Sequence, residues 1–360
     1  MSSAATPPTA PAGPTSSASN WTSGRKLWNP DLPRPHRQVA SRVWNARNNL
    51  SIGETMKERE FIDWIRSQRE GDSAVVVVGP GDDCAVLACG GEKLLVSTDQ
   101  LLDGVHFDLK RDGAEAAGRK AMARALSDLA AMAAKPLAAV ATVTLPKGFT
   151  RADAEALYRG RRSVSDAFAC PMVGGDVGSW SGPLAIGVTV FGTSGGVKPI
   201  LRSGAIAGEA LCVTGRLGGS WRTDRHLKFS PRIVEARKLA AKYHVGAMID
   251  ISDGLALDLW RLCEASGVGA EVQAQAVPCH DDAVAGRKIT PLQAALGDGE
   301  DYELLFTLPA DQAEELCRTQ PLGTPITRIG QTVNPDAGVM LVHPEGKREK
   351  LEPAGWEHET

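Results

Sequence analysis

Six short acidic motifs, each beside glycine or another small residue, recur from one half of the chain to the other. They are GPGDDCAV at 79–86, STDQLLDGVHF at 97–107, LSDLAAM at 126–132, VGGDVG at 173–178, IDISDG at 249–254 and GDGEDYE at 297–303. A carboxylate beside a flexible residue can point into a site that backbone also approaches closely. Converging carboxylates repel one another unless cations lie between them, and such oxygen donors suit magnesium. We therefore expect a fold that gathers the motifs at a multi-metal site for phosphoryl transfer.

The composition argues against several classes of protein. The 360 residues suffice for two domains, and 42% of them are hydrophobic, so a sizeable core can form. A net charge of −3 is unlike that of nucleic-acid-binding proteins, and no apolar run approaches the roughly 20 residues of a membrane span. The seven cysteines include no CxxC pair, which predicts reduced thiols in a cytoplasmic protein without zinc or disulfides.

Residues 1–55 differ in composition from the rest. They are rich in Pro, Ser, Thr and Ala and have a single acidic residue before Glu54. This composition predicts a disordered leader, with a transit peptide or a true start of translation at Met56 as alternatives. From Met56 the sequence MKEREFIDWIRSQ has the period of an amphipathic helix, with Phe61, Ile62 and Ile65 on one side. We expect a chain that begins at Met56 to keep full activity.

From residue 74 onward, short apolar strands alternate with helices, which predicts an α/β (α+β) chain. We place an N-terminal domain at 56–195 and a C-terminal domain at 196–360, with a site in the cleft between them. The expected strands are 74–79, 85–89, 93–99, 137–145, 184–192, 211–215, 247–252, 270–274, 302–308, 327–333 and 339–343, and the expected helices are 114–134, 151–169, 231–242, 254–265 and 310–319.

Each acidic motif also has an ordinary explanation. Asp82 and Asp83 stand side by side, so we expect only one of them to be a direct ligand, and a plain acidic turn is the alternative. Asp128 follows Arg124 by four residues, which fits an ion pair on a solvated helix face. Its apolar neighbours and its place near the helix C-terminus, where an acid is disfavoured, favour a functional role instead. A single histidine such as His106 is more often structural.

The later motifs lie at the ends of strands. Two glycines before Asp176 let backbone amides approach a phosphate. Asp250 and Ser252 share one face of their strand, whereas Asp253 opens the next helix either as an N-cap or as a ligand. The carboxylates of 297–303 fit a site or a solvated charged loop.

No Walker A sequence, protein-kinase catalytic loop or GxGxxG fingerprint after a strand occurs. The order STDxLxxGxHF, LSDLAAM, GGD, IDxSDGL and GEDYEL resembles the thiamine-monophosphate kinase family, which belongs to the superfamily of aminoimidazole ribonucleotide synthetase. The resemblance runs from about Met56 to the last residues. It implies a two-domain aminoimidazole ribonucleotide synthetase-like fold, a homodimer whose N-terminal sheets pair, and synthesis of thiamine diphosphate from thiamine monophosphate and ATP.

The resemblance also implies roles for single residues. Several Mg²⁺ ions would be held by Asp83, Ser97, Thr98, Asp99, Asp128, Asp176, Asp250 and Asp253. ATP would be contacted by Tyr158, Gly175, Asp176, Arg202 and Ser252, with Asp128, Asp176 and Arg202 as the catalytic set. Thiamine monophosphate would be contacted by His106, Glu300 and Trp356.

Three features depart from the family pattern. Val177 stands where the family usually has Thr, Asp298 replaces a Gly, and the segment after Gly215 is shorter, as if a helix were missing. Two alternatives remain. A selenophosphate synthetase-like enzyme of the same superfamily would need a reactive Cys that 56–73 lacks, and a non-catalytic nucleotide-binding relative would be expected to have lost its acidic residues.

Overall fold

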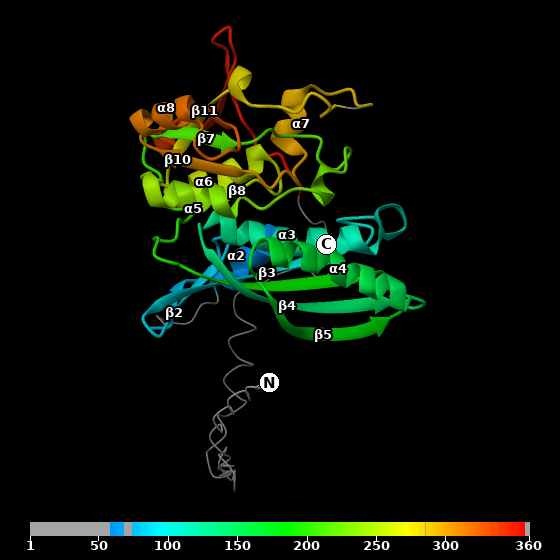
Figure 1. Cartoon of the computed structure of the whole chain (residues 1–360). Helices are drawn as coiled ribbons and strands as arrows, with labels where there is room; N and C mark the ends of the chain where they lie inside the picture. Colours follow the sequence, from blue (N-terminus) through cyan, green and yellow to red (C-terminus); the bar gives the residue numbers. More distant parts are fainter. Residues whose placement is uncertain (1–57, 68–73, 285, 357–360) are drawn as a thin grey trace, which may run out of the picture. The chain divides into compact units, whose positions relative to one another are not determined.

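The computed structural model describes residues 58–67, 74–284 and 286–356 (Figure 1). The predictions for residues 1–55 lie outside these ranges. Within them the strands form two sheets with helices packed on their faces, so the predicted α/β class is confirmed. None of the described helices is both long enough and apolar enough to cross a membrane.

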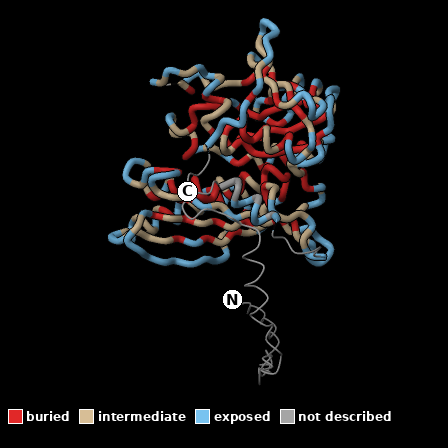
Figure 2. The backbone as a smooth tube through the Cα atoms, turned by 180° about the vertical axis from the view of Figure 1, so that it is seen from behind, coloured by how far each residue is buried: buried red, intermediate tan, exposed pale blue. Residues whose placement is uncertain are grey.

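The first sheet has the strand order β1-β2-β3-β6-β4-β5. Its strands are β1 (Val76–Val78), β2 (Ala85–Cys89), β3 (Glu92–Leu102), β4 (Lys135–Pro146), β5 (Met172–Trp180) and β6 (Ala185–Thr193). The predicted hairpin is present as β2 and β3, which pair antiparallel. Strand β5 runs parallel to β4, continues through the whole VGGDVG motif, and is exposed along nearly all of its length (Figure 2).

Helices α3 (Leu109–Ala131) and α4 (Arg151–Ala167) lie on one face of this sheet (Figure 1). They approach each other closely because glycine stands at both contact points. A Cβ at Gly118 would lie 2.1 Å from the backbone oxygen of Leu157, and one at Gly160 would lie 1.9 Å from that of Glu115. Helix α3 also packs against the second half of the chain, and most of its alanines are buried between the two halves and α4.

Helix α3 begins five residues before the predicted start at residue 114. The Asp108 side chain accepts hydrogen bonds from the backbone nitrogens of Lys110 and Arg111, which caps the new N-terminus. Gly113, at φ +80°, kinks the helix just after this first turn, in a region that favours glycine. The alanine pattern that suggested a start at 114 therefore marks only the regular part of the helix.

The second sheet has the order β13-β12-β9-β11-β7-β10-β8. Its strands are β7 (Ala210–Thr214), β8 (Met248–Asp250), β9 (Gly269–Gln273), β10 (Leu304–Leu308), β11 (Ile326–Val333), β12 (Val339–Val342) and β13 (Arg348–Lys350). The helices of this half are α5 (Ile233–Lys242), α6 (Leu255–Ser266), α7 (Pro291–Gly297) and α8 (Ala310–Thr319), with 3₁₀ turns at Arg225–Leu227, Ala274–Ala276 and Pro335–Ala337. The short elements α7 and β13 were not predicted. The first sheet ends at residue 193 and the second begins at 210, while the boundary between 195 and 196 stays a prediction.

Helix α2 (Glu58–Ser67) confirms the amphipathic helix expected after Met56. Its apolar residues Phe61, Ile62 and Ile65 are 45%, 38% and 40% exposed, so the described chain covers them only in part. Ile62 nevertheless reaches the lining of the main cavity. The helix therefore lies near the site.

Candidate active site

A cavity of about 840 Å³ is lined by both halves of the chain. It has an acidic lining in which nine carboxylates face three guanidinium groups. The carboxylates are those of Asp82, Asp83, Asp99, Asp128, Asp250, Asp253, Glu264, Asp298 and Glu300, and the guanidinium groups are those of Arg124, Arg202 and Arg261. Five of the six motifs contribute to this lining, so the structure brings together most of what the sequence predicted to converge.

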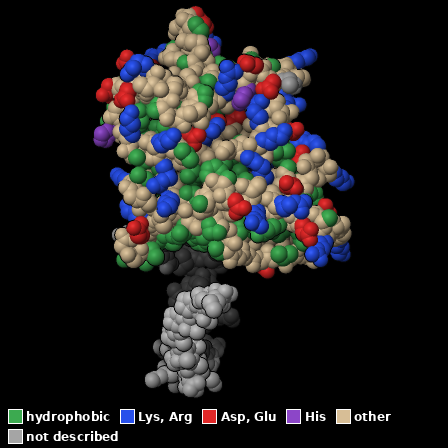
Figure 3. Space-filling model, viewed as in Figure 1, with side chains coloured by type: hydrophobic (Ala, Val, Ile, Leu, Met, Phe, Trp, Pro, Cys, Tyr) green, Lys and Arg blue, Asp and Glu red, His purple; other side chains and the backbone are tan. Residues whose placement is uncertain are grey.

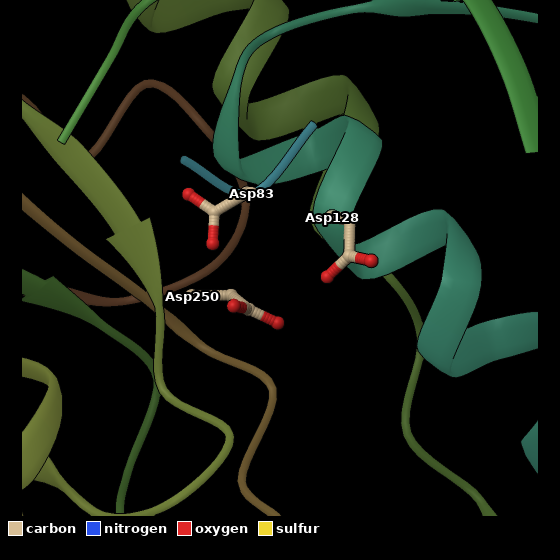
Figure 4. A group of neighbouring side chains, drawn as sticks. All are labelled: Asp83, Asp128 and Asp250. Atoms are coloured by element: carbon tan, nitrogen blue, oxygen red, sulfur yellow. The ribbon is translucent and has the colours of Figure 1, made fainter. Parts of the chain in front are cut away.

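Three carboxylates form the tightest group in the cavity. Asp83 follows the turn after β1, Asp128 lies in the last turn of α3, and Asp250 ends β8. Each offers an oxygen, and these three oxygens lie within 4.8 Å of one another. Figure 4 shows the three side chains converging from separate elements. Only long-range folding can make such a group, and its hard oxygen donors suit Mg²⁺.

Neighbouring polar groups orient the three carboxylates. The Ser97 hydroxyl donates a hydrogen bond to Oδ2 of Asp128. The Ser127 hydroxyl donates to Oδ2 of Asp250 at 2.5 Å. Arg202 donates to Oδ1 of Asp83 from Nε at 3.2 Å and from Nη2 at 2.5 Å. The side chains are thus held in place, although among the described residues only Asp83 of the three forms an ion pair.

The pKa values of Asp250 and Asp128 are raised because the three carboxylates are buried with little positive charge near them. Burial, followed by the charge of Asp83, raises the pKa of Asp250 to about 8. Burial, followed by the charges of Asp250, Asp99 and Asp83, raises the pKa of Asp128 well above its ordinary value. In addition, Oδ2 of Asp83 is buried without a hydrogen-bond partner among the described residues. The unpaired oxygen of Asp83, and the raised pKa values of Asp250 and Asp128, fit a site for a divalent cation, which would supply the missing positive charge.

Asp99 lies beside this group but has its own cation. Its Oδ2 lies 2.8 Å from Nε of Arg124. The alternative explanation of Asp128, a helical ion pair with Arg124, is therefore wrong, because Arg124 turns to β3 and Asp128 faces Ser97 instead. Asp128 thus has no cationic partner in its own helix.

The IDISDG loop has a different capping arrangement from the one expected. Gly254, at φ +121°, precedes helix α6, and no side chain caps it there. Asp258 instead accepts hydrogen bonds from the backbone nitrogens of Ser252 and Asp253 at 3.1 and 3.0 Å. Asp253 is not an N-cap; its Oδ2 pairs with Arg261 at 2.5 Å. Ser252 and Asp253 both line the cavity.

The three residues predicted to contact thiamine monophosphate, His106, Glu300 and Trp356, all line the cavity. The rings of His106 and Trp356 lie 5.7 Å apart between centroids at an interplanar angle of 56°. The backbone nitrogen of Leu102 donates to Nδ1 of His106 at 3.0 Å, which leaves the ring proton of a neutral His106 on Nε2. Glu300 approaches from the loop before β10.

Five predicted residues are not part of the cavity lining, and one of them, Ser97, contacts the site only through its hydrogen bond to Asp128. Thr98 alternates with Ser97 and Asp99 on β3 and faces the other side of the sheet, where its hydroxyl accepts a hydrogen bond from Thr189 at 3.0 Å. The other three are Gly175 and Asp176 on the outer strand β5, and Tyr158, 48% exposed on α4. Their roles stay predictions.

Several residues of the site were not predicted. Lys120 and Arg124 in α3, together with Trp221, Ser127 and Tyr302, contact the predicted residues or line the cavity. A signal was present for the first two, because Lys120 and Arg124 stand four residues apart in the alanine-rich, apolar part of the helix. Trp221 belongs to none of the acidic motifs, so no sequence pattern indicates a place for it at the site.

Comparisons with known proteins agree with this geometry. The model for "AIR synthase related protein, N-terminal domain" matches residues 81–194, and that for "AIR synthase related protein, C-terminal domain" matches 220–343. Thiamine-monophosphate kinase from Rhodopirellula baltica is 37% identical over 314 residues, which cover 84% of this chain and 97% of the relative. That from Escherichia coli K12 is 32% identical and covers 86% and 99% of the two chains. A solved structure described as AaThiL complexed with AMPPCP and TMP superposes with a TM-score of 0.72 at 30% identity, covering 84% and 97%.

The fold and the acidic cavity thus define a two-domain protein of the AIR synthase related class. Within that class, the identity over nearly the full length of its relatives decides the family. The chain belongs to the thiamine-monophosphate kinase family, whose members are kinases, and the predicted resemblance is confirmed.

Proposed function

We propose that this chain transfers the γ-phosphoryl group of ATP directly to the phosphate of thiamine monophosphate, giving thiamine diphosphate and ADP. The names of the relatives support the reaction, and AMPPCP, an ATP analogue, supports the nucleotide. The observation that carries the proposal is the group of Asp83, Asp128 and Asp250 inside a cavity that also contains His106 and Glu300. Residues predicted to bind metal and residues predicted to bind the substrate thus line the same cavity.

The acceptor, the phosphate of thiamine monophosphate, needs no general base from the protein. The second pKa of a phosphate monoester is about 6, so at neutral pH the acceptor oxygen is already ionised. No side chain has to remove a proton from it. The difficulty lies in bringing two polyanions into line, which requires positive charge and alignment. We therefore infer in-line transfer without a phospho-enzyme.

The acidic side chains would hold the magnesium ions. Asp83, Asp128 and Asp250 offer the convergent oxygens, and Asp99 and Asp253 border them. When bound, Mg²⁺ would neutralise phosphate charge and stabilise the transferring group. Ser97 and Ser127 keep the carboxylates oriented before any ligand arrives. The number of ions stays a prediction.

Arg202 would serve the nucleotide from a fixed position. Asp83 holds its Nε and Nη2, and Asp82 accepts from its backbone nitrogen at 3.2 Å. Nη1 makes no hydrogen bond within the described ranges, and the side chain is 20% exposed. This nitrogen would therefore face a phosphate oxygen. Ser252, which lines the same cavity, would contact the same ligand.

The residues outside the cavity fit a homodimer. Strand β5, which carries Gly175 and Asp176, is the edge of its sheet and exposes Val173, Val177 and Trp180 at 65%, 70% and 49%. Figure 3 shows hydrophobic side chains gathered along the lower part of this face, where β5 lies in Figure 1. An unpaired apolar edge is a surface that proteins usually cover. We infer that the N-terminal sheets of two protomers pair and cover this edge. In the dimer, Asp176 would then contact Mg²⁺ and ATP, and Tyr158 would contact ATP.

One assay tests the reaction. Purified protein is incubated with ATP, Mg²⁺ and thiamine monophosphate, and thiamine diphosphate and ADP are quantified by chromatography. We expect equal amounts of both products, and none with EDTA. ATP made chiral at the γ-phosphorus with oxygen isotopes tests the mechanism, because one in-line transfer inverts the configuration. A folded protein that makes no thiamine diphosphate overturns the function, whereas retention overturns direct transfer alone. A cytoplasmic location stays a prediction.

A further inference from the structure

Lys120 is a lysine in the alanine-rich helix α3 whose side chain is fully buried. Its Nζ lies 2.6 Å from the backbone oxygen of His106, 2.8 Å from Nδ1 of His226 and 2.5 Å from Oε2 of Glu300. These three acceptors match the three N–H donors of an ammonium group. We call these four residues the Lys120 cluster.

The charges of the cluster follow from its burial. Burial, opposed by the charge of Glu300, lowers the pKa of Lys120 to about 8, so the amine is still mainly charged at pH 7. Burial and the neighbouring charge of Lys120 lower the pKa of His226 to about 3, so this ring is neutral and accepts through Nδ1. The cluster therefore contains one cation and one anion, which offset each other.

Trp221 borders the cluster at the cavity. Its ring stacks on His226 with centroids 4.4 Å apart, and Nζ of Lys120 lies 5.2 Å from the ring centroid. Trp221 itself lines the cavity, whereas Lys120 and His226 do not. The segment after Gly215 thus supplies two side chains, Trp221 and His226, that enclose the lysine. Lys120 can act on a ligand only through its partners.

The cluster connects the two substrate-side elements. His106 follows β3, and Glu300 precedes β10, at φ +62°, a strained conformation for a residue other than glycine. Lys120 holds Oε2 of Glu300, and the Tyr302 hydroxyl donates to the same oxygen at 3.2 Å. Oε1 has no hydrogen-bond partner within residues 58–67, 74–284 and 286–356. Since the side chain lines the cavity and is 18% exposed, Oε1 is the oxygen a ligand can reach.

We propose, on the basis of the proposed function, that Lys120 is a positioning residue that fixes Glu300 and offsets its charge. Glu300 then serves as a hydrogen-bond acceptor for an uncharged donor of the substrate. In thiamine monophosphate that donor is the amino group of the pyrimidine ring, and the cationic thiazolium pairs elsewhere. The chemistry supports this choice, because an already compensated carboxylate gains little from a second cation.

Equilibrium binding tests the positioning role without relying on turnover. Calorimetry measures the Kd of thiamine monophosphate for the wild type and for Lys120→Met, which leaves Glu300 uncompensated. We expect the Kd to rise about 30-fold or more, because losing one partner of a buried charged pair has effects of this size. The Kd of AMPPCP is expected to stay within about twofold. Arg119→Met is the matched control, since Arg119 joins α3 to the backbone oxygens of Leu227 and Phe229 away from the cavity.

A double variant shows whether Lys120 acts through Glu300. We expect Lys120→Met combined with Glu300→Gln to bind no more weakly than Glu300→Gln alone, because the uncompensated charge is gone. Additive losses, or an equal loss in Arg119→Met, would reduce Lys120 to a structural residue and overturn the proposal. If Lys120→Met does not fold, the role of Glu300 is still tested with the Glu300→Gln variant, which keeps Lys120, in the experiment with substrate analogues.

Substrate analogues identify the group that Glu300 recognises. The loss of affinity on Glu300→Gln is measured with thiamine monophosphate, with its neutral-ring 3-deaza analogue, and with oxythiamine monophosphate, which lacks the amino group. We expect the same loss for the first two and a much smaller loss for the third. A loss that disappears with the neutral ring would make Glu300 a counter-ion and overturn the proposal. A wild type that binds thiamine monophosphate without phosphorylating it refutes the function only, and one that does not bind it refutes both.

Discussion

We predict that Asp250→Asn stabilises the metal-free protein at alkaline pH and weakens its stabilisation by Mg²⁺. Burial and the charge of Asp83 raise the pKa of Asp250 from 3.8 to about 8. A carboxyl group whose pKa is raised by folding contributes stability that is fully present below its unfolded pKa. That stability is lost as the pH rises through the folded pKa, here across the range from about 4 to about 8. Asparagine has no charge to bury, and its oxygen can still accept the hydrogen bond from Ser127.

The expected change in the free energy of unfolding follows from the raised pKa of Asp250. About three pH units separate the ordinary pKa from neutral pH, and at about 1.36 kcal/mol per unit the penalty reaches roughly 4 kcal/mol. Asp83 and Asp128 share the charge of this group, so removing one carboxylate relieves only part of the penalty. We expect a gain of about 1–3 kcal/mol, or roughly 3–8 °C in Tm.

Scanning calorimetry at about pH 5 and about pH 8.5, with EDTA or with Mg²⁺, measures this difference. We expect the metal-free variant to exceed the wild type mainly at the higher pH, and Mg²⁺ to raise the Tm of the wild type more than that of the variant. Asp166→Asn is the control, because Asp166 is an exposed acid that pairs with Arg162 on α4. A metal-free Asp250→Asn protein that melts below the wild type at the higher pH would refute the reasoning, as would an equal response to Mg²⁺.

Three further predictions concern catalysis, packing and assembly. Asp128→Asn is expected to lower kcat by at least about 100-fold with little or no loss in Tm, and near-normal turnover would remove Asp128 from the site. Gly160→Ala places a Cβ 1.9 Å from the backbone oxygen of Glu115 and should cost about 1–3 kcal/mol in chemical denaturation. Gly297→Ala, which has open space around its Cβ, should cost far less, and equal losses would contradict the packing argument. Val173→Glu on β5 should shift the mass in light scattering from dimer to monomer; an unchanged mass would place the dimer interface elsewhere.

The sequence predicted what local patterns determine. Apolar periods and glycine positions predict most strands and helices, whereas the resemblance to the family identifies Asp83, Asp128 and Asp250 as ligands, and these three lie together in the structure. Short elements such as α7 were missed because seven residues carry too little periodicity. The position of Trp221 could not be predicted either, since residues 215–224 form neither a helix nor a strand. These failures concern regions in which tertiary contacts, and not local propensity, determine the conformation.

The partners of Arg124 and Asp128 show why ion pairs within a helix are poor predictions. Four residues advance a helix by about 6 Å, and two residues advance a strand by about 6.6 Å. Arg124 and Asp128 therefore match the spacing of Asp99 and Ser97 on β3, and the two pairs form between the elements. A pair within the helix contributes only about 0.2–0.5 kcal/mol, so packing of α3 on the sheet easily overrides it. The rotation of α3 about its axis is set by close contacts such as that at Gly118, which the spacing of charges does not reveal. That rotation directs the ion pair of Arg124 to Asp99, so that Asp128 forms no ion pair with any described residue and can serve as a metal ligand.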